Sequence, residues 1–120
     1  MARLLRRARL LKPGDFESTF KSGSRLSEKW LTAVVAANPL GHPRLGLAVA
    51  KKSVRLATAR NRIKRCIRES FRARQPRLAG VDIVILTRSG CADIPNAELR
   101  DCLDRLWNRI HARCAPSSSA

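Results

Sequence analysis

The sequence predicts an α/β (α+β) two-layer sandwich, in which helices pack on a small mixed sheet in the order α-β-β-α-β-α. Residues 81–87 form a nearly continuous apolar run, which is typical of a strand covered on both faces. Two longer segments, near residues 56–74 and 95–113, instead repeat their apolar residues at helical spacing. With 120 residues, 44% of them hydrophobic, the chain can form one domain with its own core.

The domain limits follow from composition. Residues 1–12 are expected to form a flexible basic arm, residues 13–114 a single α/β domain, and residues 115–120 a polar tail. No apolar stretch reaches the ~18 residues of a membrane span, and none of signal-peptide length follows the basic start. We therefore expect a cytoplasmic protein without membrane contact. Its four cysteines lack metal-ligand spacing and are expected to be reduced, with Cys66 and Cys102 packed in helices.

The first half of the domain is expected to hold one helix and two strands. Asp15 is suited to cap a short helix that reaches about Lys21 and ends at Gly23. Residues 30–37 and 44–50 are predicted to be strands, joined in antiparallel order by a turn at residues 38–43. The second strand alternates large side chains, which suit a core, with small ones, which leave a smooth face: Leu45, Leu47 and Val49 against Gly46, Ala48 and Ala50.

The helix predicted at residues 56–74 carries the main charge signal. Residues 51–74 hold ten cations and one acid, Glu69. Four of the cations recur at every fourth residue and would stack along one face: Arg60, Lys64, Arg68 and Arg72. Three like-charge pairs at this spacing oppose the helix by about 1 kcal/mol in total, so the row is expected to face a polyanion. The opposite face is apolar and can pack on a core through Ile63, Ile67 and Phe71.

The second half of the chain is predicted to add a strand at residues 81–87 and a final helix at residues 95–113. The buried stripe of that helix is expected to consist of Leu99, Leu103, Leu106 and Ile110, extended by Trp107. If the strands at residues 44–50 and 81–87 pair in parallel, the basic helix is the crossover between them. Such crossovers are right-handed by default.

The net charge of +16 is concentrated in the first part of the chain. Residues 1–75 hold 19 cations and 4 acids, whereas residues 76–120 hold 6 and 5. Nineteen of the 25 cations are arginine, whose planar guanidinium suits bidentate contact with phosphate. A genome biased toward arginine codons accounts equally well for that preference, but it does not account for the clustering. The first part is therefore predicted to bind a polyanionic partner.

The sequence offers no set of residues that would make the protein itself a catalyst. Paired carboxylates at a convincing spacing are lacking, and no Cys–His or Ser–His combination emerges. Asp101 and Asp104 are better explained as a polar helix face than as a metal pair. We predict no catalytic residue and no metal site in the protein.

Three ordered segments form a specific set of motifs: Gly46-Leu-Ala-Val-Ala-Lys-Lys52, Ala59-Arg-Asn-Arg-Ile-Lys-Arg65 and Arg68-Glu-Ser-Phe71. Together they resemble the signature of the protein subunit of bacterial ribonuclease P, and the resemblance covers roughly residues 9–113. A lone Arg-Asn-Arg is a weak signal, but the ordered set is specific. The chain departs from many members by placing Ser53-Val54-Arg55 where a glycine follows the lysine pair, and by having no tyrosine.

The resemblance implies a left-handed crossover at the basic helix. It also implies that a large RNA is the catalyst, which uses Mg²⁺ to cleave precursor tRNA and form the mature 5′ end. The protein would bind that RNA and guide the 5′ leader through a cleft lined by the sheet and the first helix. Mg²⁺ would be held mainly by the RNA, and no obligatory protein partner is implied.

The expected contacts fall into two sets. The RNA subunit would be bound by Arg60, Asn61, Arg62, Lys64, Arg65 and Arg68. The leader would be bound by stacking and by a cationic track, through Phe16, Phe20, Lys51, Lys52, Gly46 and Ala48. Each assignment has a structural alternative: the phenylalanines can be core, Gly46 can be a tight spot beneath a helix, Asn61 can bond to the backbone, and the cations can be a solvated face.

Three other functions fit the composition. A ribosomal or other structural RNA-binding protein would look the same, and a nuclease acting alone would be equally basic. A DNA-binding module would place the basic helix in a groove, but such a helix normally adds base-reading polar residues. This helix offers little beyond Asn61 and Gln75 for that purpose.

Overall fold

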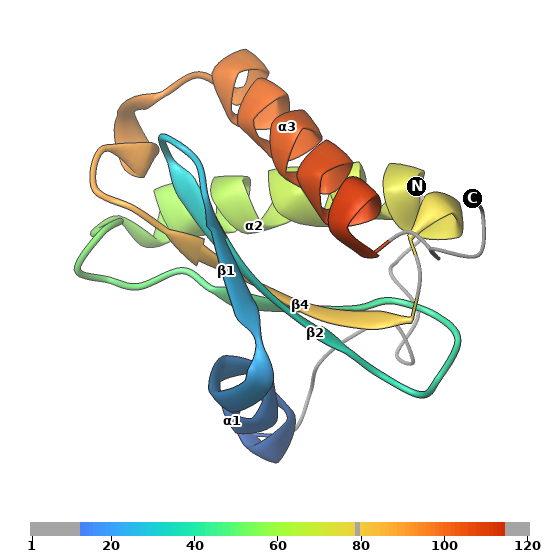
Figure 1. The fold of residues 1–120 in the computed structure, drawn as a ribbon. Coiled ribbons are helices and arrows are strands. Elements are labelled where there is room, and N and C mark those ends of the chain that lie inside the picture. Colours follow the sequence, from blue (N-terminus) through green and yellow to red (C-terminus); the bar gives the residue numbers. More distant parts are fainter. Residues whose placement is uncertain (1–12, 79, 115–120) are drawn as a thin grey trace.

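Three helices and four strands make up the described part of the chain (Figure 1). This computed structural model describes residues 13–78 and 80–114, so the predicted arm and tail lie outside the described residues. The helices are α1 (Pro13–Ser22), α2 (Ala57–Arg74) and α3 (Asn96–Cys114). The strands are β1 (Ser24–Ser27), β2 (Leu31–Ala37), β3 (Arg44–Ala48) and β4 (Val81–Thr87). Short 3-10 turns lie at Gln75–Arg77 and Cys91–Asp93.

The strands form one mixed sheet in the order β1-β2-β4-β3. β2 is antiparallel to both of its neighbours, β1 and β4, whereas β3 runs parallel to β4. The expected antiparallel order of β2 and β3 is confirmed, but the two strands are not neighbours because β4 lies between them. α2 is the crossover from β3 to β4, as the sequence predicts, and its left-handed sense stays a prediction.

Most of the element bounds agree with the predictions, and the differences are at the ends. β4 covers residues 81–87 as predicted, and α2 and α3 each begin one residue later than expected. α1 begins at Pro13, so Asp15 lies in its first turn and does not cap it. β3 ends at Ala48, two residues early. β1 was not predicted, because it has four residues and only Leu26 among them is buried.

The main core lies between the sheet and the pair α2 and α3 (Figure 1). The predicted stripes are confirmed, since these side chains are fully buried: Ile63, Ile67, Phe71, Leu99, Leu103, Leu106, Trp107 and Ile110. The Trp107 and Phe71 ring centroids are 5.8 Å apart, and Trp107 Nε1 donates to Ser70 Oγ at 2.6 Å. Cys66 and Cys102 are free thiols packed in this core, as expected.

A smaller apolar cluster lies on the opposite face of the sheet, where α1 packs (Figure 1). Val34 and Val84 are fully buried there, and Phe16, Ala48 and Leu86 pack against them. The predicted alternation of β3 is confirmed: Leu45 belongs to the main core, while Ala48 belongs to the smaller cluster. The sheet therefore carries α2 and α3 on one face and α1 on the other.

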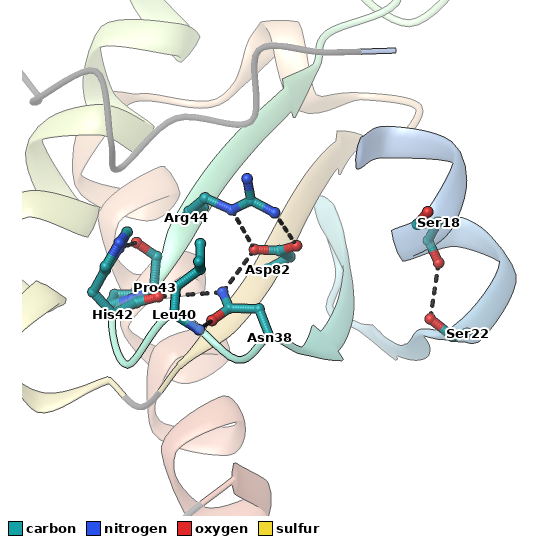
Figure 2. Close-up of polar contacts among 8 residues, drawn as sticks. All are labelled: Ser18, Ser22, Asn38, Leu40, His42, Pro43, Arg44 and Asp82. Atoms are coloured by element: carbon teal, nitrogen blue, oxygen red, sulfur yellow. Dashed lines mark hydrogen bonds and ion pairs between the residues drawn. The ribbon is translucent and has the colours of Figure 1, made fainter. Parts of the chain in front are cut away.

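A buried carboxylate joins the ends of three strands (Figure 2). Arg44 Nε and Nη2 donate to the two oxygens of Asp82 at 2.8 and 2.7 Å. Asn38 Nδ2 donates to Asp82 Oδ1 at 2.8 Å and to His42 O at 3.2 Å, while its Oδ1 accepts from Leu40 N at 2.9 Å. These charge-assisted bonds satisfy the buried charge and hold the turn that aims β3 along the sheet.

Candidate nucleic-acid interface

The segment between β3 and α2 is anchored by one buried side chain and one arginine. Val54 is fully buried, and its backbone N donates to Ala50 O at 2.9 Å. Arg60 Nη1 donates to Val54 O at 3.0 Å and to Arg55 O at 2.7 Å. The Ser53-Val54-Arg55 departure thus forms a loop that is held against α2, and the Arg60 guanidinium is partly used in holding it.

Arg62 ties α2 to the segment that precedes α3. Its Nη1 donates to Asn96 Oδ1 at 2.6 Å, and its Nη2 donates to Ala92 O at 3.1 Å. The side chain of Arg62 is half-buried as a result. Arg60 and Arg62 of the predicted RNA-binding set therefore make contacts within the protein, which the sequence did not predict.

A groove of about 650 Å³ lies between α2 and α3. Its α2 wall includes a stripe at positions i, i+3, i+7 and i+10, namely Thr58, Asn61, Arg65 and Arg68. Arg62, Cys66 and Glu69 of α2 complete this wall. Asn96 and Arg100 of α3 line it from the other side. The lining holds four arginines and a single acid, Glu69, so the groove is strongly electropositive.

The predicted row of cations on α2 is divided between different surroundings. Arg60 bonds to the preceding loop, Arg68 lines the groove, and Arg72 lines a separate hollow of about 300 Å³ with His42 and Gln75. Lys64 is half-buried, whereas Asn61, Arg65 and Arg68 are exposed. The structure therefore brings Asn61, Arg65 and Arg68 together from the predicted set.

The residues predicted to bind the 5′ leader lie on α1, on β3 and in the turn after β3. α1 packs on the sheet face away from α2 and α3 (Figure 1). Phe16 is half-buried and packs in the same small cluster as Ala48. Phe20, one turn further along α1, is 39% exposed. Gly46 is buried in β3 and pairs with Val84. Lys51 and Lys52 are exposed in the turn that follows β3.

The sequence did not predict a binding role for Arg100, and it left Trp30 without a role. Arg100 lies in a stretch with nearly balanced charge, and only the packing of α3 on α2 places it beside the basic helix. Trp30 packs against the main core, and Lys29 Nζ lies 5.0 Å from its ring centroid. Trp30 is therefore separate from the cluster that holds Phe16.

Among residues 13–78 and 80–114, no three His, Cys, Asp or Glu side chains gather in a way that could hold a metal ion. Within the same residues, no helix has the length and apolar character needed to cross a membrane. The donor set of the groove, with four arginines, suits an anion and not Mg²⁺.

Comparisons with known proteins agree on one family. The family model described as Ribonuclease P matches residues 4–111. The ribonuclease P protein component of Nitrosococcus oceani is 45% identical over 109 residues, which is 91% of this chain and 92% of that protein. The Escherichia coli protein component is 47% identical over 113 residues, 94% of each chain.

Solved structures agree with the sequence relatives. The RNase P protein of Staphylococcus aureus has a TM-score of 0.82 and 27% identity, and the match covers 91% of this chain and 98% of that one. The RNase P protein of Thermotoga maritima has a TM-score of 0.76 and 32% identity, covering 85% of this chain and 96% of that one. The similarity thus extends over the sheet and all three helices.

Proposed function

This chain belongs to the ribonuclease P protein family, and we propose that it holds the 5′ leader of precursor tRNA against the sheet face on which α1 packs. As a family member it is the protein component of the ribonucleoprotein endoribonuclease that matures tRNA 5′ ends, and its partner is the ribonuclease P RNA. The ribosomal alternative considered from the sequence is therefore set aside.

The proposed contact with the RNA subunit is the α2 surface. It comprises Arg60, Asn61, Arg62, Lys64, Arg65 and Arg68, of which the exposed Asn61, Arg65 and Arg68 line one groove. The observation that carries this assignment is the groove itself, in which four arginines oppose one acid. A phosphate backbone would neutralise that charge, with Asn61 available to a base edge or a 2′-hydroxyl.

The proposed leader surface combines aromatic, small and cationic residues, as sequence-tolerant binding of a single strand requires. Phe20 presents an exposed ring on α1, while Phe16 packs beneath it with Ala48. Lys51 and Lys52 are exposed just beyond β3, where Gly46 and Ala48 keep the strand surface low. Phe20 is therefore the better candidate for base stacking, and Phe16 supports the helix that carries it.

We propose that the Mg²⁺ ions of the reaction are held mainly by the RNA. The groove of the proposed RNA contact is lined by four arginines and a single carboxylate, Glu69, whereas Mg²⁺ prefers several carboxylate, phosphate and water oxygens. We also propose that the protein acts in the cytoplasm, where thiols stay reduced. The buried free thiols Cys66, Cys91 and Cys102 suit that compartment.

Reconstitution of the complex tests whether the RNA performs the cleavage and the protein promotes it. The purified protein, a ribonuclease P RNA and a precursor tRNA are mixed at low Mg²⁺, and release of the leader is measured. Cleavage is expected when all three are present and is expected to be absent with protein and precursor alone. Cleavage by the protein alone, or RNA activity that the protein does not increase, would overturn the proposal.

The leader surface is tested with Phe20→Ala. If a base stacks on this ring, the variant should weaken binding of a precursor with a leader by about 1–3 kcal/mol and leave mature tRNA unaffected. Phe20→Trp retains an aromatic face and should restore most of the affinity. Equal losses for precursor and mature tRNA would remove Phe20 from the leader surface.

A further inference from the structure

We propose that α3 supplies a second wall of the RNA contact, with Arg100 binding a phosphate of the ribonuclease P RNA together with Arg65 and Arg68 of α2. This inference rests on the proposed binding of the RNA subunit by α2. It extends the contact to a helix whose charge is nearly balanced and which the sequence motifs do not include.

The geometry of the groove supports the second wall. On α2, Asn61, Arg65 and Arg68 are spaced so that their side chains lie along one stripe. On α3, Asn96 and Arg100 are four residues apart, so they share one face of that helix. Both faces line the same groove of about 650 Å³, which lies within the range of about 300–1,000 Å³ typical of ligand sites.

The charge of Arg100 is used differently from the charges of Arg105 and Arg109 on the same helix. Further along this helix, Arg105 and Arg109 pair with the two oxygens of Glu28 at 3.0 and 2.7 Å. In the part of the chain that the structure describes, no acid pairs with Arg100. Arg100 lines the groove together with Arg62, Arg65 and Arg68, a concentration of positive charge that a bound phosphate would neutralise.

Arg62 is a positioning residue for this groove. Its bonds to Asn96 Oδ1 and Ala92 O fasten the start of α3 to the middle of the basic stretch of α2. This link sets the separation of the two walls at the end where Arg100 lies, one turn beyond Asn96. A phosphate group can then reach guanidiniums from both helices without the helices having to move.

Binding of the ribonuclease P RNA to the full chain at several salt concentrations tests the second wall. Arg100→Ala should weaken binding about 10-fold, as expected for a lost hydrogen bond to a charged group. It should also reduce the slope of log affinity against log salt by about 0.7–0.9, the value for one phosphate contact. Arg100→Lys keeps the positive charge and should keep the slope.

Arg113→Ala is the matched control, because it removes one exposed charge from the last turn of α3, outside the groove. A loss in Arg100→Ala no greater than in Arg113→Ala, with wild-type binding intact, would overturn the second wall alone. If the wild-type chain failed to bind the RNA, the proposed function itself would fall. Equal thermal unfolding midpoints of the variants would show that the comparison concerns binding and not folding.

Discussion

Helices α2 and α3 share one core but present different charges to their surroundings. α2 has 18 residues with seven cations and one acid, while α3 has 19 residues with four cations and three acids. Three of these charges of α3 are paired within the protein: Arg105 and Arg109 bind Glu28, and Asp104 binds Arg74. Stability therefore comes from the apolar stripes that both helices bury, and we propose that RNA binding comes mainly from the exposed cations of α2.

A second difference lies within α2 itself. Arg60 and Arg62 donate to acceptors in the preceding loop and near the start of α3, and Arg74 bonds to Asn108. Arg65 and Arg68 are exposed and line the groove, which Arg62 also lines. We propose that α2 divides its arginines between shaping the interface and contacting the RNA, so substitutions of the two kinds should differ in their effects on stability and on RNA binding.

Trp107→Ala should have the largest effect on stability, because it leaves a cavity in the shared core where α3 packs on Phe71 of α2. Trp107 is fully buried, and replacing a buried tryptophan by alanine typically costs about 3–5 kcal/mol. The free energy of unfolding, measured with urea, checks this value. Trp107→Phe keeps most of the ring and loses the bond to Ser70, so it should cost clearly less. A small loss in Trp107→Ala would mean that the two helices do not depend on one core.

Gly90→Ala should have the next largest effect on stability, because it distorts the backbone just before the 3-10 turn that leads to α3. Gly90 has φ +87°, and an added Cβ would lie 2.8 Å from Trp30 Cζ3. Backbone strain and this clash together should cost about 2–3 kcal/mol of unfolding free energy. Gly41→Ala is the matched control, since its φ is +79° but nothing lies within 4 Å of the added Cβ. Equal losses of unfolding free energy in the two variants would show that the Trp30 ring moves aside without a measurable cost.

Arg62→Ala and Arg65→Ala should separate the two uses of arginine on α2. Arg62→Ala removes bonds to Asn96 and Ala92 and should lower the unfolding free energy by about 1–2 kcal/mol. Arg65→Ala removes an exposed side chain and should change stability by less than about 0.5 kcal/mol. For RNA binding, Arg65→Ala should reduce the salt slope by about 0.7–0.9. The distinction fails if both variants lose stability equally.

The sequence could predict the features that repeat locally along the chain, but not those that depend on contacts between distant segments. Long periodic segments located α2 and α3 to within a residue at their starts, because each stripe repeats its signal over several turns. β1 gave no such signal, since only Leu26 of its four residues is buried and its pairing with β2 is tertiary. The cations of α2 were visible in the sequence, but the internal role of Arg62 depends on Asn96, which is 34 residues away. Arg100 was missed for the same reason.

A loss of stability smaller than those of Trp107→Ala and Gly90→Ala is expected at Glu28, which pairs with Arg105 and Arg109 of α3. Burial opposes ionisation of the Glu28 carboxyl, but hydrogen bonds from Arg105 and Arg109 outweigh it and hold its pKa below the ordinary 4.5. A carboxyl with a lowered folded pKa stabilises the protein above its unfolded pKa, and this contribution is lost as pH falls through the folded pKa. Glu28→Gln should therefore cost about 1 kcal/mol at pH 7, since these arginines are largely exposed.

The pH dependence of Glu28→Gln tests whether the Glu28 carboxylate is held as an ion by Arg105 and Arg109. Urea unfolding of wild type and variant at intervals from neutral pH to below 4.5 should show their stability difference shrinking as the wild-type carboxyl becomes protonated. Glu98→Gln removes an exposed acid from the first turn of α3 and controls for the change in net charge. A stability difference that stays constant over this range would mean that Arg105 and Arg109 do not hold Glu28 as an ion. Arg105 and Arg109 would then be as available to a partner as the exposed cations of α2.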